Sequence, residues 1–353
     1  MVDKHASASH YVAMRIRNVL SLLVVAGLVA AACGSSSTEA TEDAGGAITV
    51  YSGRSEDLIA PIFQAFEDET GIEINVKYDD SANLALLIET EGDATPADVF
   101  VSQSPGAVGF LDGKGLLQEL PANITDRVDP LYRSVDGTWV GATARARTLV
   151  YNPTLISEDE LPMGVLEIQE PQWAGRVGVA PSNGSFQDFV TAFRFQEGDD
   201  VVSDWLTALA DGGAPTYAKN SAIVDAVARG EIELGLVNHY YVLETLAEDP
   251  DAPVANHFFP ATDVGSLVIV TGTAILGQSD NVANAQKLLE FFLSDEAQVM
   301  FSAGEGEYPL VEGIPIPEGL PPLSGLGYTV DLSELGGGLE ATAEIIRDSG
   351  LQG

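Results

Sequence analysis

The chain has 353 residues, with 16 lysines and arginines against 53 aspartates and glutamates, which gives a formal net charge of −37. This charge argues against nucleic acid or an anionic membrane surface as the main partner, because either would repel most of the protein surface. Hydrophobic residues make up 45% of the chain and charged residues 20%. The chain therefore has enough apolar material to fold, and its length suits two domains of ordinary size.

Residues 1–33 have the pattern of a lipoprotein signal peptide. Basic residues precede the apolar run 19–29, which is shorter than the roughly 20 residues that a membrane-spanning helix needs. Three alanines come directly before Cys33, the only cysteine of the chain. We expect Cys33 to be lipidated and to anchor the protein outside the cytoplasm, at the outer face of the cytoplasmic membrane. The alternative is an ordinary cleaved signal peptide with an incidental thiol.

Residues 34–46 are rich in glycine, serine, threonine and acidic residues, and they contain no apolar face. We expect them to form a flexible tether between the lipid anchor and the folded protein. Met14 is a second possible start of translation, because the basic residues that follow it are enough for a signal peptide.

Short strands alternate with amphipathic helices from Ala47 onward. Apolar residues alternate with polar residues in the strand patterns and recur at helical spacing in the helix patterns. The βαβ order predicts an α/β fold with parallel strands covered by helices. We expect Asn220 or Ser221 to cap the helix at 223–227. The predicted strands are 48–51, 72–76, 97–102, 177–180 and 232–236, and the predicted helices are 58–66, 82–91, 186–193, 223–227 and 282–292.

Polar side chains follow four of the predicted strands, at the carboxyl ends where α/β sheets bind their ligands. They are hydroxyls, amides, phenols and acids, with few cations. The segments are 53–57, 102–105, 181–185 and 238–241.

Tyr240 and Tyr241 are the only adjacent tyrosines in the chain, and they directly follow a predicted strand. Adjacent residues of an extended segment point to opposite faces, so the chain must turn here if both phenols are to reach one ligand. The alternative is two ordinary aromatic residues, one in the core and one on the surface.

Six segments of the chain resemble the iron(III)-binding substrate-binding proteins of ABC transporters, in the same order and with similar spacing. This resemblance implies a two-lobed, type 2 periplasmic-binding-protein fold with mixed sheets, flanking helices and a hinged cleft. It places lobe 1 at 47–147 plus about 271–320, and lobe 2 at 148–270 plus about 321–353. The segments are 48–54, 96–100, 145–152, 217–221, 238–241 and 307–310.

By this resemblance, Tyr240 and Tyr241 bind Fe³⁺ as phenolates. A small trivalent cation prefers hard anionic oxygen and can displace the proton of a phenol. The first lobe departs from the family, because Ser55 and Gln103 stand where one branch has histidine and glutamate, and Phe186 stands where another has a third tyrosine.

Ser55, Gln103 and Ser104 are therefore only possible first-lobe contacts. A bound anion, water, Glu56 or Asp57 would complete the coordination. The alternative is that the site holds an iron chelate or a different ligand.

The resemblance also implies a site for a synergistic anion such as phosphate or carbonate. Helix N-termini and arginine side chains suit an oxyanion. For Arg145 and Arg147 the alternative is a structural ion pair. The residues carried over to the anion site are Arg147, Asn183, Gly184, Ser185, Asn220 and Asn238.

Three further residues receive no ligand role. We expect His239 to face solvent or to support the tyrosines without binding the metal. Glu307 lies in a segment that the family uses structurally. Asp263 is interpreted as a turn or cap residue.

The chain contains no Gly-x-Ser-x-Gly motif, no phosphate-binding Gly-rich loop, no His-Glu-x-x-His motif and no cysteine nucleophile with a histidine partner. We therefore expect an extracytoplasmic, lipid-anchored monomer that is not an enzyme. It would capture ferric iron with a synergistic anion and deliver it to an ABC permease and its ATPase, without a nucleic-acid partner. The alternatives are a binder of an iron chelate or another small anionic solute, and a surface sensor or interaction lipoprotein.

Overall fold

The computed structural model describes residues 45–304, 306–326 and 330–351. They belong to one compact unit that spans Ala44–Gly353. The predicted signal peptide, Cys33 and nearly all of the predicted tether lie outside the described residues. Within the described ranges, no helix combines the length and the apolar character that crossing a lipid bilayer requires.

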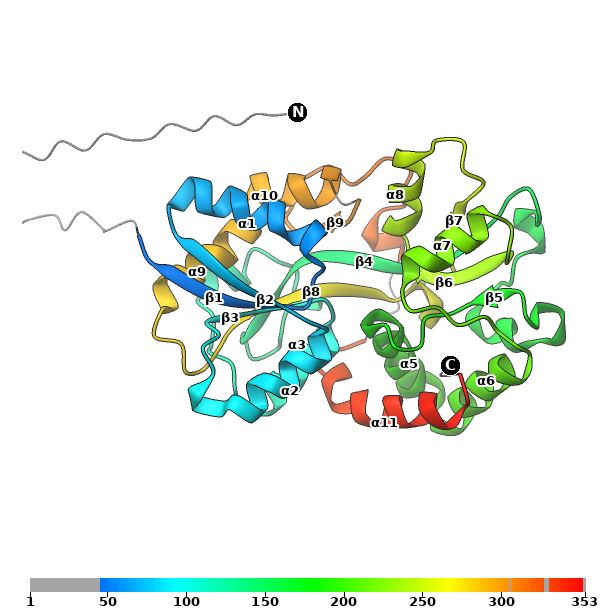
Figure 1. The fold of residues 1–353 in the computed structure, drawn as a ribbon, viewed down its shortest axis with the longest axis horizontal. Coiled ribbons are helices and arrows are strands. Elements are labelled where there is room, and N and C mark those ends of the chain that lie inside the picture. Colours follow the sequence, from blue (N-terminus) through cyan, green and yellow to red (C-terminus); the bar gives the residue numbers. More distant parts are fainter. Residues whose placement is uncertain (1–44, 305, 327–329, 352–353) are drawn as a thin grey trace, which may run out of the picture. The chain divides into compact units, whose positions relative to one another are not determined.

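A mixed sheet of nine strands runs through the described part of the chain (Figure 1). The strands are β1 (Ala47–Ser52), β2 (Glu73–Tyr78), β3 (Val99–Ser102), β4 (Trp139–Tyr151), β5 (Val177–Gly178), β6 (Leu234–Asn238), β7 (Ala255–His257), β8 (Val268–Ile275) and β9 (Tyr308–Pro309). Their order is β2-β1-β3-β8-β4-β6-β5, and β7 and β9 also pair with β4. β1 is parallel to β2 and β3, and β5 is parallel to β6. β4 and β8 are antiparallel to their partners.

The long strand β4 changes its partner between two neighbouring residues. It pairs with β8 as far as Ala146, and from Arg147 onward it pairs with β6, with Arg147 opposite Asn238. Every residue of β4 is buried. β4 and β8 therefore connect the part of the sheet that contains β1–β3 with the part that contains β5–β7 (Figure 1).

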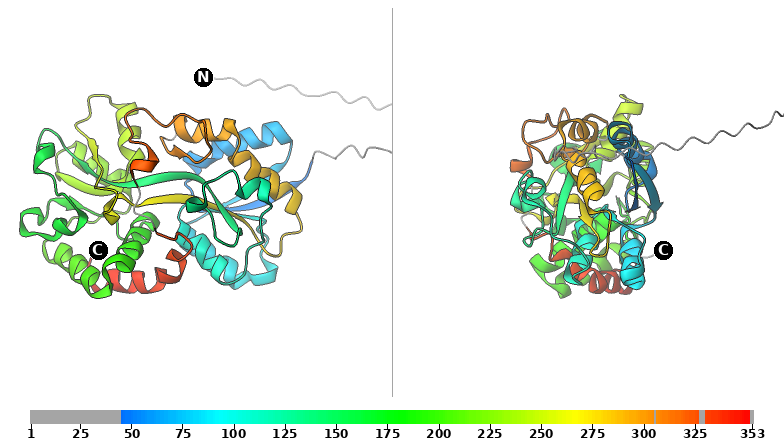
Figure 2. Two further views of the ribbon diagram at one scale, coloured as in Figure 1. Left: turned by 180° about the vertical axis from the view of Figure 1, so that it is seen from behind. Right: turned by 90° about the vertical axis from the view of Figure 1, so that its left-hand side faces the viewer.

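Helices cover both faces of this sheet (Figures 1 and 2). In the first part, Ile48 and Val50 of β1 pack toward α1 and α9, whereas Tyr51 and Phe100 belong to the core beneath α2 and α3. The described α-helices are α1 (Glu56–Thr70), α2 (Ser81–Glu91), α3 (Pro105–Gly113), α4 (Ala122–Thr125), α5 (Gly184–Glu197), α6 (Asp199–Asp211), α7 (Asn220–Ala228), α8 (Tyr240–Glu248), α9 (Val282–Phe292), α10 (Asp295–Val299) and α11 (Leu335–Asp348).

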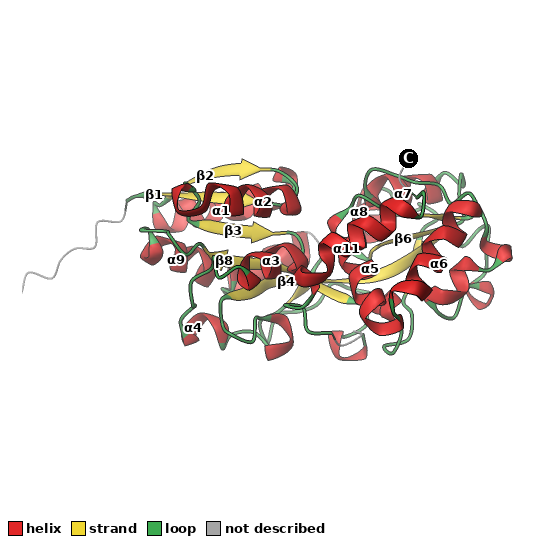
Figure 3. Cartoon of the chain, turned by 90° about the horizontal axis from the view of Figure 1, so that it is seen from below, coloured by secondary structure: helices red, strands yellow, loops and turns green. Residues whose placement is uncertain are grey.

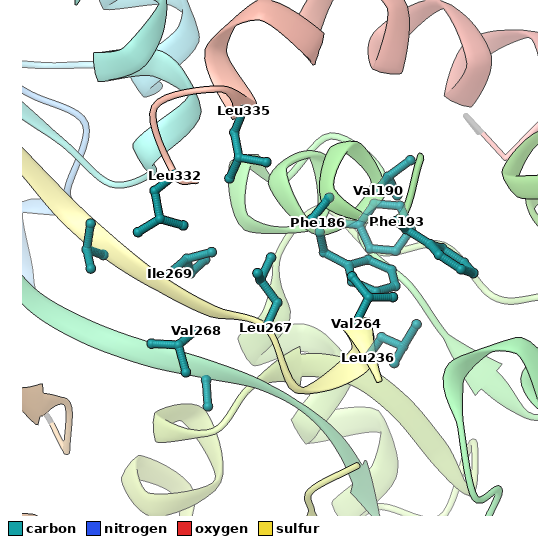
Figure 4. Packing of buried hydrophobic residues seen from close by; sticks show 14 of the residues in the cluster. Phe186, Val190, Phe193, Leu236, Val264, Leu267, Val268, Ile269, Leu332 and Leu335 are labelled. Atoms are coloured by element: carbon teal, nitrogen blue, oxygen red, sulfur yellow. The ribbon is translucent and has the colours of Figure 1, made fainter. Parts of the chain in front are cut away.

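The helix α11 packs against both α3 and α5 (Figure 3). A Cβ atom at Gly336 would lie 2.5 Å from the carbonyl carbon of Gly109, so the two helix backbones are in direct contact. On the other side, the hydroxyls of Thr342 and Thr191 are hydrogen-bonded at 2.7 Å. Leu335 belongs to the same core as the α5 and β8 side chains, as Figure 4 shows.

Most of the predicted elements are present, and one prediction from the pattern is wrong. The parallel pairs that the βαβ order predicts are found among β1–β3 and between β5 and β6. β4 and β8 insert antiparallel between these groups, so the mixed sheet that the resemblance implied is confirmed. Asn220 does not cap its helix: it is the first helical residue, Lys219 takes the N-cap position, and no side chain caps this end. The Asn220 side chain is buried and bonds none of the helix N–H groups.

Candidate functional site

The tyrosine pair lies where β6 ends and α8 begins. The chain passes through His239 in a helical conformation, and Tyr240 and Tyr241 form the first turn of α8. Their ring centroids are 4.2 Å apart with 32° between the ring planes. The turn that both phenols require is therefore present, and the two rings are stacked side by side.

Burial raises the pKa of both phenols. Tyr240 is completely buried and its pKa lies well above the ordinary value, first because of desolvation and then because of neighbouring Tyr241. Its hydroxyl forms no hydrogen bond of full geometry with a described residue. Tyr241 is half-buried, and desolvation raises its pKa as well, although its contact with the Tyr240 hydroxyl acts in the opposite direction. Both phenols consequently keep their protons at neutral pH unless a cation displaces them.

His239 is fully buried, so of the two alternatives given for it the solvent-facing one is wrong and the supporting one remains. The backbone N–H of Ala146 donates to its Nδ1 at 3.1 Å, and its Nε2–H donates to the carbonyl of Gly306 at 2.9 Å. Desolvation lowers the pKa of His239 to about 4. Both ring nitrogens are occupied, so this neutral side chain holds the segment before the tyrosines and is not available to a metal.

A chain of hydrogen bonds links three of the predicted anion-binding residues. Arg147 Nη1 donates to Asn238 Oδ1 at 3.0 Å, and Asn238 Nδ2 donates to Ser185 Oγ at 3.2 Å. Asn183 caps α5 by accepting the backbone N–H of Ser185 at 3.1 Å, and Gly184 opens the helix beside it. The structure thus brings five predicted residues together at the N-terminus of α5.

The two arginines of β4 differ in their surroundings. Arg145 Nη1 lies 3.8 Å from a Glu307 carboxylate oxygen and donates to Thr271 Oγ1 at 2.9 Å. The same carboxylate forms a fully buried ion pair with Arg54 at 2.6 Å. Burial raises the pKa of Glu307, but Arg54 and Arg145 outweigh it and hold the pKa below its ordinary value. Arg145 therefore takes part in a structural ion pair with Glu307, which is the alternative given for it above.

Arg147 forms no ion pair with a described residue. Its guanidinium lies 5.7 Å over the ring of Phe189, and its Nε and Nη2 atoms are buried without hydrogen-bond partners. Desolvation lowers the pKa of Arg147 to about 9. Unpartnered buried N–H groups are rare in folded proteins, so these donors are candidates for binding a ligand.

Several more buried polar atoms form no hydrogen bond of full geometry with a described residue. They are both amide atoms of Asn220, both carboxylate oxygens of Asp188, and Arg145 Nε and Nη2. The charges of Arg145 and Arg147 act on Asp188. Asn220 was predicted from the resemblance. Asp188 was missed, although its position three residues after Ser185 in a helix places it on the same helix face as Ser185.

The predicted first-lobe contacts are only partly in place. Ser104 is buried at the start of α3, and its hydroxyl would be 3.8 Å from a Cβ at Gly184, so it reaches the start of α5. Gln103 is half-buried and its backbone N–H bonds Ser81. Ser55 is exposed at the N-cap of α1 and its side chain forms no cap hydrogen bond.

The alternatives for the first lobe are no better placed. Glu56 and Asp57 are exposed, and the charge of Glu56 acts on Tyr78. Phe186 is buried in the core against Phe189 at 5.9 Å, so its position supplies no third phenol to the pair. In the described ranges, no three His, Cys, Asp or Glu side chains gather in a metal-binding group.

Two acidic residues hold structural positions, as expected. Asp263 caps the short helix that precedes β8 and accepts the Gly265 N–H at 2.7 Å. Glu307 is a buried ion-pair partner, which agrees with the structural role given to its segment.

A cavity of about 470 Å³ adjoins α8 one helical turn beyond the tyrosines. Its lining includes Leu243 and Glu244 of α8, Gly306, and the apolar residues Ile314 and Ile316. Glu244 is half-buried, and desolvation, followed by the charge of Glu307, raises its pKa to about 7.

The family described as bacterial extracellular solute-binding protein matches residues 52–299. The chain belongs to this family. The solute-binding protein is 35% identical over 269 residues to the major ferric iron-binding protein of Neisseria meningitidis, covering 74% of this chain and 80% of that protein.

Two solved structures show the same fold as this solute-binding protein. Iron-bound HitA from Pseudomonas aeruginosa matches with a TM-score of 0.82 and 32% identity over 86% of this chain and 99% of that chain. The Trichodesmium protein IdiA (FutA) in complex with iron and citrate matches with a TM-score of 0.74 and 26% identity, again over 86% and 99%.

The predicted two-lobed, type 2 periplasmic-binding fold is thereby confirmed. The family consists of extracellular binding proteins and not of enzymes, which agrees with the expected class and with a location outside the cytoplasm.

Proposed function

We propose that this protein captures ferric iron outside the cytoplasm and delivers it to an ABC permease and its ATPase. The observation that carries the proposal is the stacked pair of phenols, buried Tyr240 and half-buried Tyr241, whose phenolate charges act on the buried guanidinium groups of Arg145 and Arg147. The iron-binding names of the relatives support it.

The chemistry of the pair suits a trivalent cation. A buried phenol is a poor ligand while it is protonated, but Fe³⁺ stabilises the phenolate enough to displace the proton. The positive charges of Arg54 and Arg145 favour the phenolate of Tyr240. Two phenolates leave most of the positions around an octahedral cation to other ligands.

A synergistic anion supplies the remaining ligands in this proposal. The unpartnered N–H groups of Arg145, Arg147 and Asn220 are suited to an oxyanion such as phosphate or carbonate, which can also bind the metal. Ser185 and Asn238, which Arg147 orients, complete this anion cradle, with Asn183 and Gly184 at the helix start.

The proposal also includes the lobe boundaries, the lipid anchor and the tether expected from the sequence. Lobe 1 comprises 47–147 plus about 271–320, and lobe 2 comprises 148–270 plus about 321–353. The change of strand partners at Arg147 supports the first boundary. Lipidated Cys33 and the tether 34–46 keep a monomer at the membrane surface, close to its permease.

Spectroscopic iron titration tests the proposal. Ferric iron is added to the purified protein at fixed pH, with and without phosphate or bicarbonate, and the phenolate-to-iron charge-transfer band is followed. We expect a band in the native protein. Loss of a residue that only supports a metal ligand typically weakens metal binding by roughly 10- to 100-fold. Tyr240→Phe and Tyr241→Phe each remove a proposed ligand, so each should weaken iron binding by more than this.

Two control variants distinguish the loss of an iron ligand from a general disturbance of the fold. Tyr151→Phe removes a phenol at the far end of β4, and His239→Gln changes the residue next to the pair whose nitrogens are already bonded. Both variants should keep the band. A native protein that shows no band with any anion would overturn direct ligation by the tyrosines.

An iron chelate is a second candidate ligand, because one structural relative holds iron together with citrate. Equilibrium dialysis with labelled citrate distinguishes the two. Citrate retained in proportion to iron supports the chelate, whereas a band without retained citrate supports the free ion.

A further inference from the structure

Asp188 is a carboxylate that none of the roles above explains. It lies in α5 and is completely buried. The Ser104 hydroxyl and the Gly106 backbone N–H act on its carboxylate from one side, but neither contact reaches the geometry of a full hydrogen bond. A buried carboxylate with incomplete hydrogen bonds is costly, so a group that completes them is expected nearby.

The surroundings of Asp188 are those of the anion cradle. Ser185 lies three residues earlier in the same helix, so the two side chains share one face. The charges of Arg145 and Arg147 both act on the carboxylate. Ser104 and the backbone of Gly106 close the other side, since a Cβ at Gly106 would collide with Asp188 Oδ1.

A purely structural role as counter-ion does not account for this position. A counter-ion gains its stability from close pairing, whereas Arg147 donates to Asn238 and Arg145 lies close to Glu307 and donates to Thr271. The anion cradle thus offers the unpartnered N–H groups of Arg145 and Arg147 as hydrogen-bond donors. At one side it also contains the two carboxylate oxygens of Asp188, which can only accept hydrogen bonds when Asp188 is ionised.

An ionised carboxylate inside an anion site distinguishes oxyanions by their protons. Hydrogen phosphate or bicarbonate can donate its own hydroxyl to Asp188 while its other oxygens accept from the arginines. Sulfate carries no proton at neutral pH and would place its oxygens against the carboxylate charge without a hydrogen bond. Charge and size are similar for phosphate and sulfate, so the proton is the difference that this residue can recognise.

We propose that Asp188 determines the specificity of the anion site and selects oxyanions that carry a proton over fully ionised ones. This inference rests on the anion site of the proposed function. It adds a residue that the resemblance did not include, and it defines the class of anion by its chemistry.

Calorimetric titration of the iron-free protein tests the inference without depending on iron. Phosphate and arsenate form the protonated pair of ligands, and sulfate and selenate the fully ionised pair. The assay is run at pH 8, above the pKa of about 7 that burial gives Asp188, so that the carboxylate is ionised. We expect phosphate and arsenate to bind at least about 10-fold more tightly than sulfate and selenate, because one hydrogen bond to a charged group contributes about this factor to the affinity.

Asp188→Asn should reduce this preference by about 10-fold or more, mainly through tighter sulfate binding, because the amide can donate to sulfate. Asp225→Asn on the exposed face of α7 removes the same charge outside the site and should leave the preference unchanged. If Asp188→Asn does not fold, the comparison of the four anions on the native protein remains decisive.

The outcomes separate the two proposals. Equal affinity of the native protein for phosphate and sulfate would overturn the role of Asp188, as would a variant that keeps the native preference. Either result leaves the iron proposal intact when the charge-transfer band is present. A protein that selects phosphate but shows no band would instead retain the anion inference and lose direct tyrosine ligation.

Discussion

The phenols of Tyr240 and Tyr241 connect iron affinity to pH. Burial keeps both protonated in the iron-free protein, so each phenol that binds iron releases one proton. The binding constant should therefore fall by up to about 100-fold for each unit by which the pH decreases. Proton release during iron addition to weakly buffered protein measures this directly. A release well below two protons per iron would mean that only one phenol is a ligand.

His239 connects stability to pH in the same segment. Its pKa in the folded protein, about 4, lies below the ordinary value of 6.5, so the unfolded chain binds the proton more readily. The stabilisation is complete above pH 6.5 and is lost as the pH falls toward 4, by up to about 3 kcal/mol. Urea unfolding between pH 4.5 and 7.5 should show a shallower dependence for His239→Gln than for the native protein. Parallel curves would contradict this assignment.

Positions near strand ends could be predicted from the sequence. Asn238 ends β6 and Ser185 lies in the first turn of α5, so their hydrogen bond at the carboxyl ends of the strands could be anticipated. The partners of Glu307 could not, because its contact with Arg54 joins residues 253 positions apart. Asp188 lay within reach of the sequence, since helical spacing alone pairs it with Ser185.

At the scale of elements, α11 depends on glycines for its close contact with α3. A Cβ at Gly336 would lie 2.5 Å from the Gly109 carbonyl carbon and 2.8 Å from the Gly106 oxygen, whereas Gly337 has nothing within 4 Å. Gly336→Ala should lower the free energy of unfolding by about 1–3 kcal/mol through overpacking. Gly337→Ala, which adds a better helix former in open space, should raise it by up to about 1 kcal/mol.

Chemical denaturation of this matched pair measures both effects. Because the two substitutions are identical and adjacent, helix propensity cancels in the difference between them. Equal effects of the two alanines would show that α11 does not rest on the α3 backbone.

Periodicity identified most elements but not the pairing of the long strands. The apolar alternation in β1 and β2 and the helical spacing in α1 and α9 are local patterns. β4 is buried along its whole length and has no alternation, and its change from β8 to β6 depends on contacts that lie far along the chain.

For the molecule as a whole, the charge of −37 predicts a stability that depends on salt. Repulsion among surface carboxylates opposes the compact state, and salt reduces it, because the screening length falls from about 30 Å at 0.01 M to about 3 Å at 1 M. The free energy of unfolding should therefore rise with NaCl, most steeply at low concentration. Urea denaturation at a series of salt concentrations measures it, with sucrose as the uncharged control.

The proposed site itself needs few of those carboxylates. Its proposed ligands are phenols, amides and arginines, and the acidic groups near them include Asp188, Glu307 and Glu244. A salt series that changed stability while leaving anion selectivity constant would confirm that the surface charge and the binding chemistry are separate properties.

The ion pair between Arg54 and Glu307 bears on the order in which contacts form while the chain is synthesised and folds. A ribosome makes Arg54 253 positions before Glu307. During that interval the nascent chain already contains β1–β3 and, later, the tyrosines, but it lacks the carboxylate that pairs with Arg54 and lies near Arg145. Contacts of such separation form slowly. We therefore expect this buried ion pair to be among the last contacts to form, at the end of synthesis and folding.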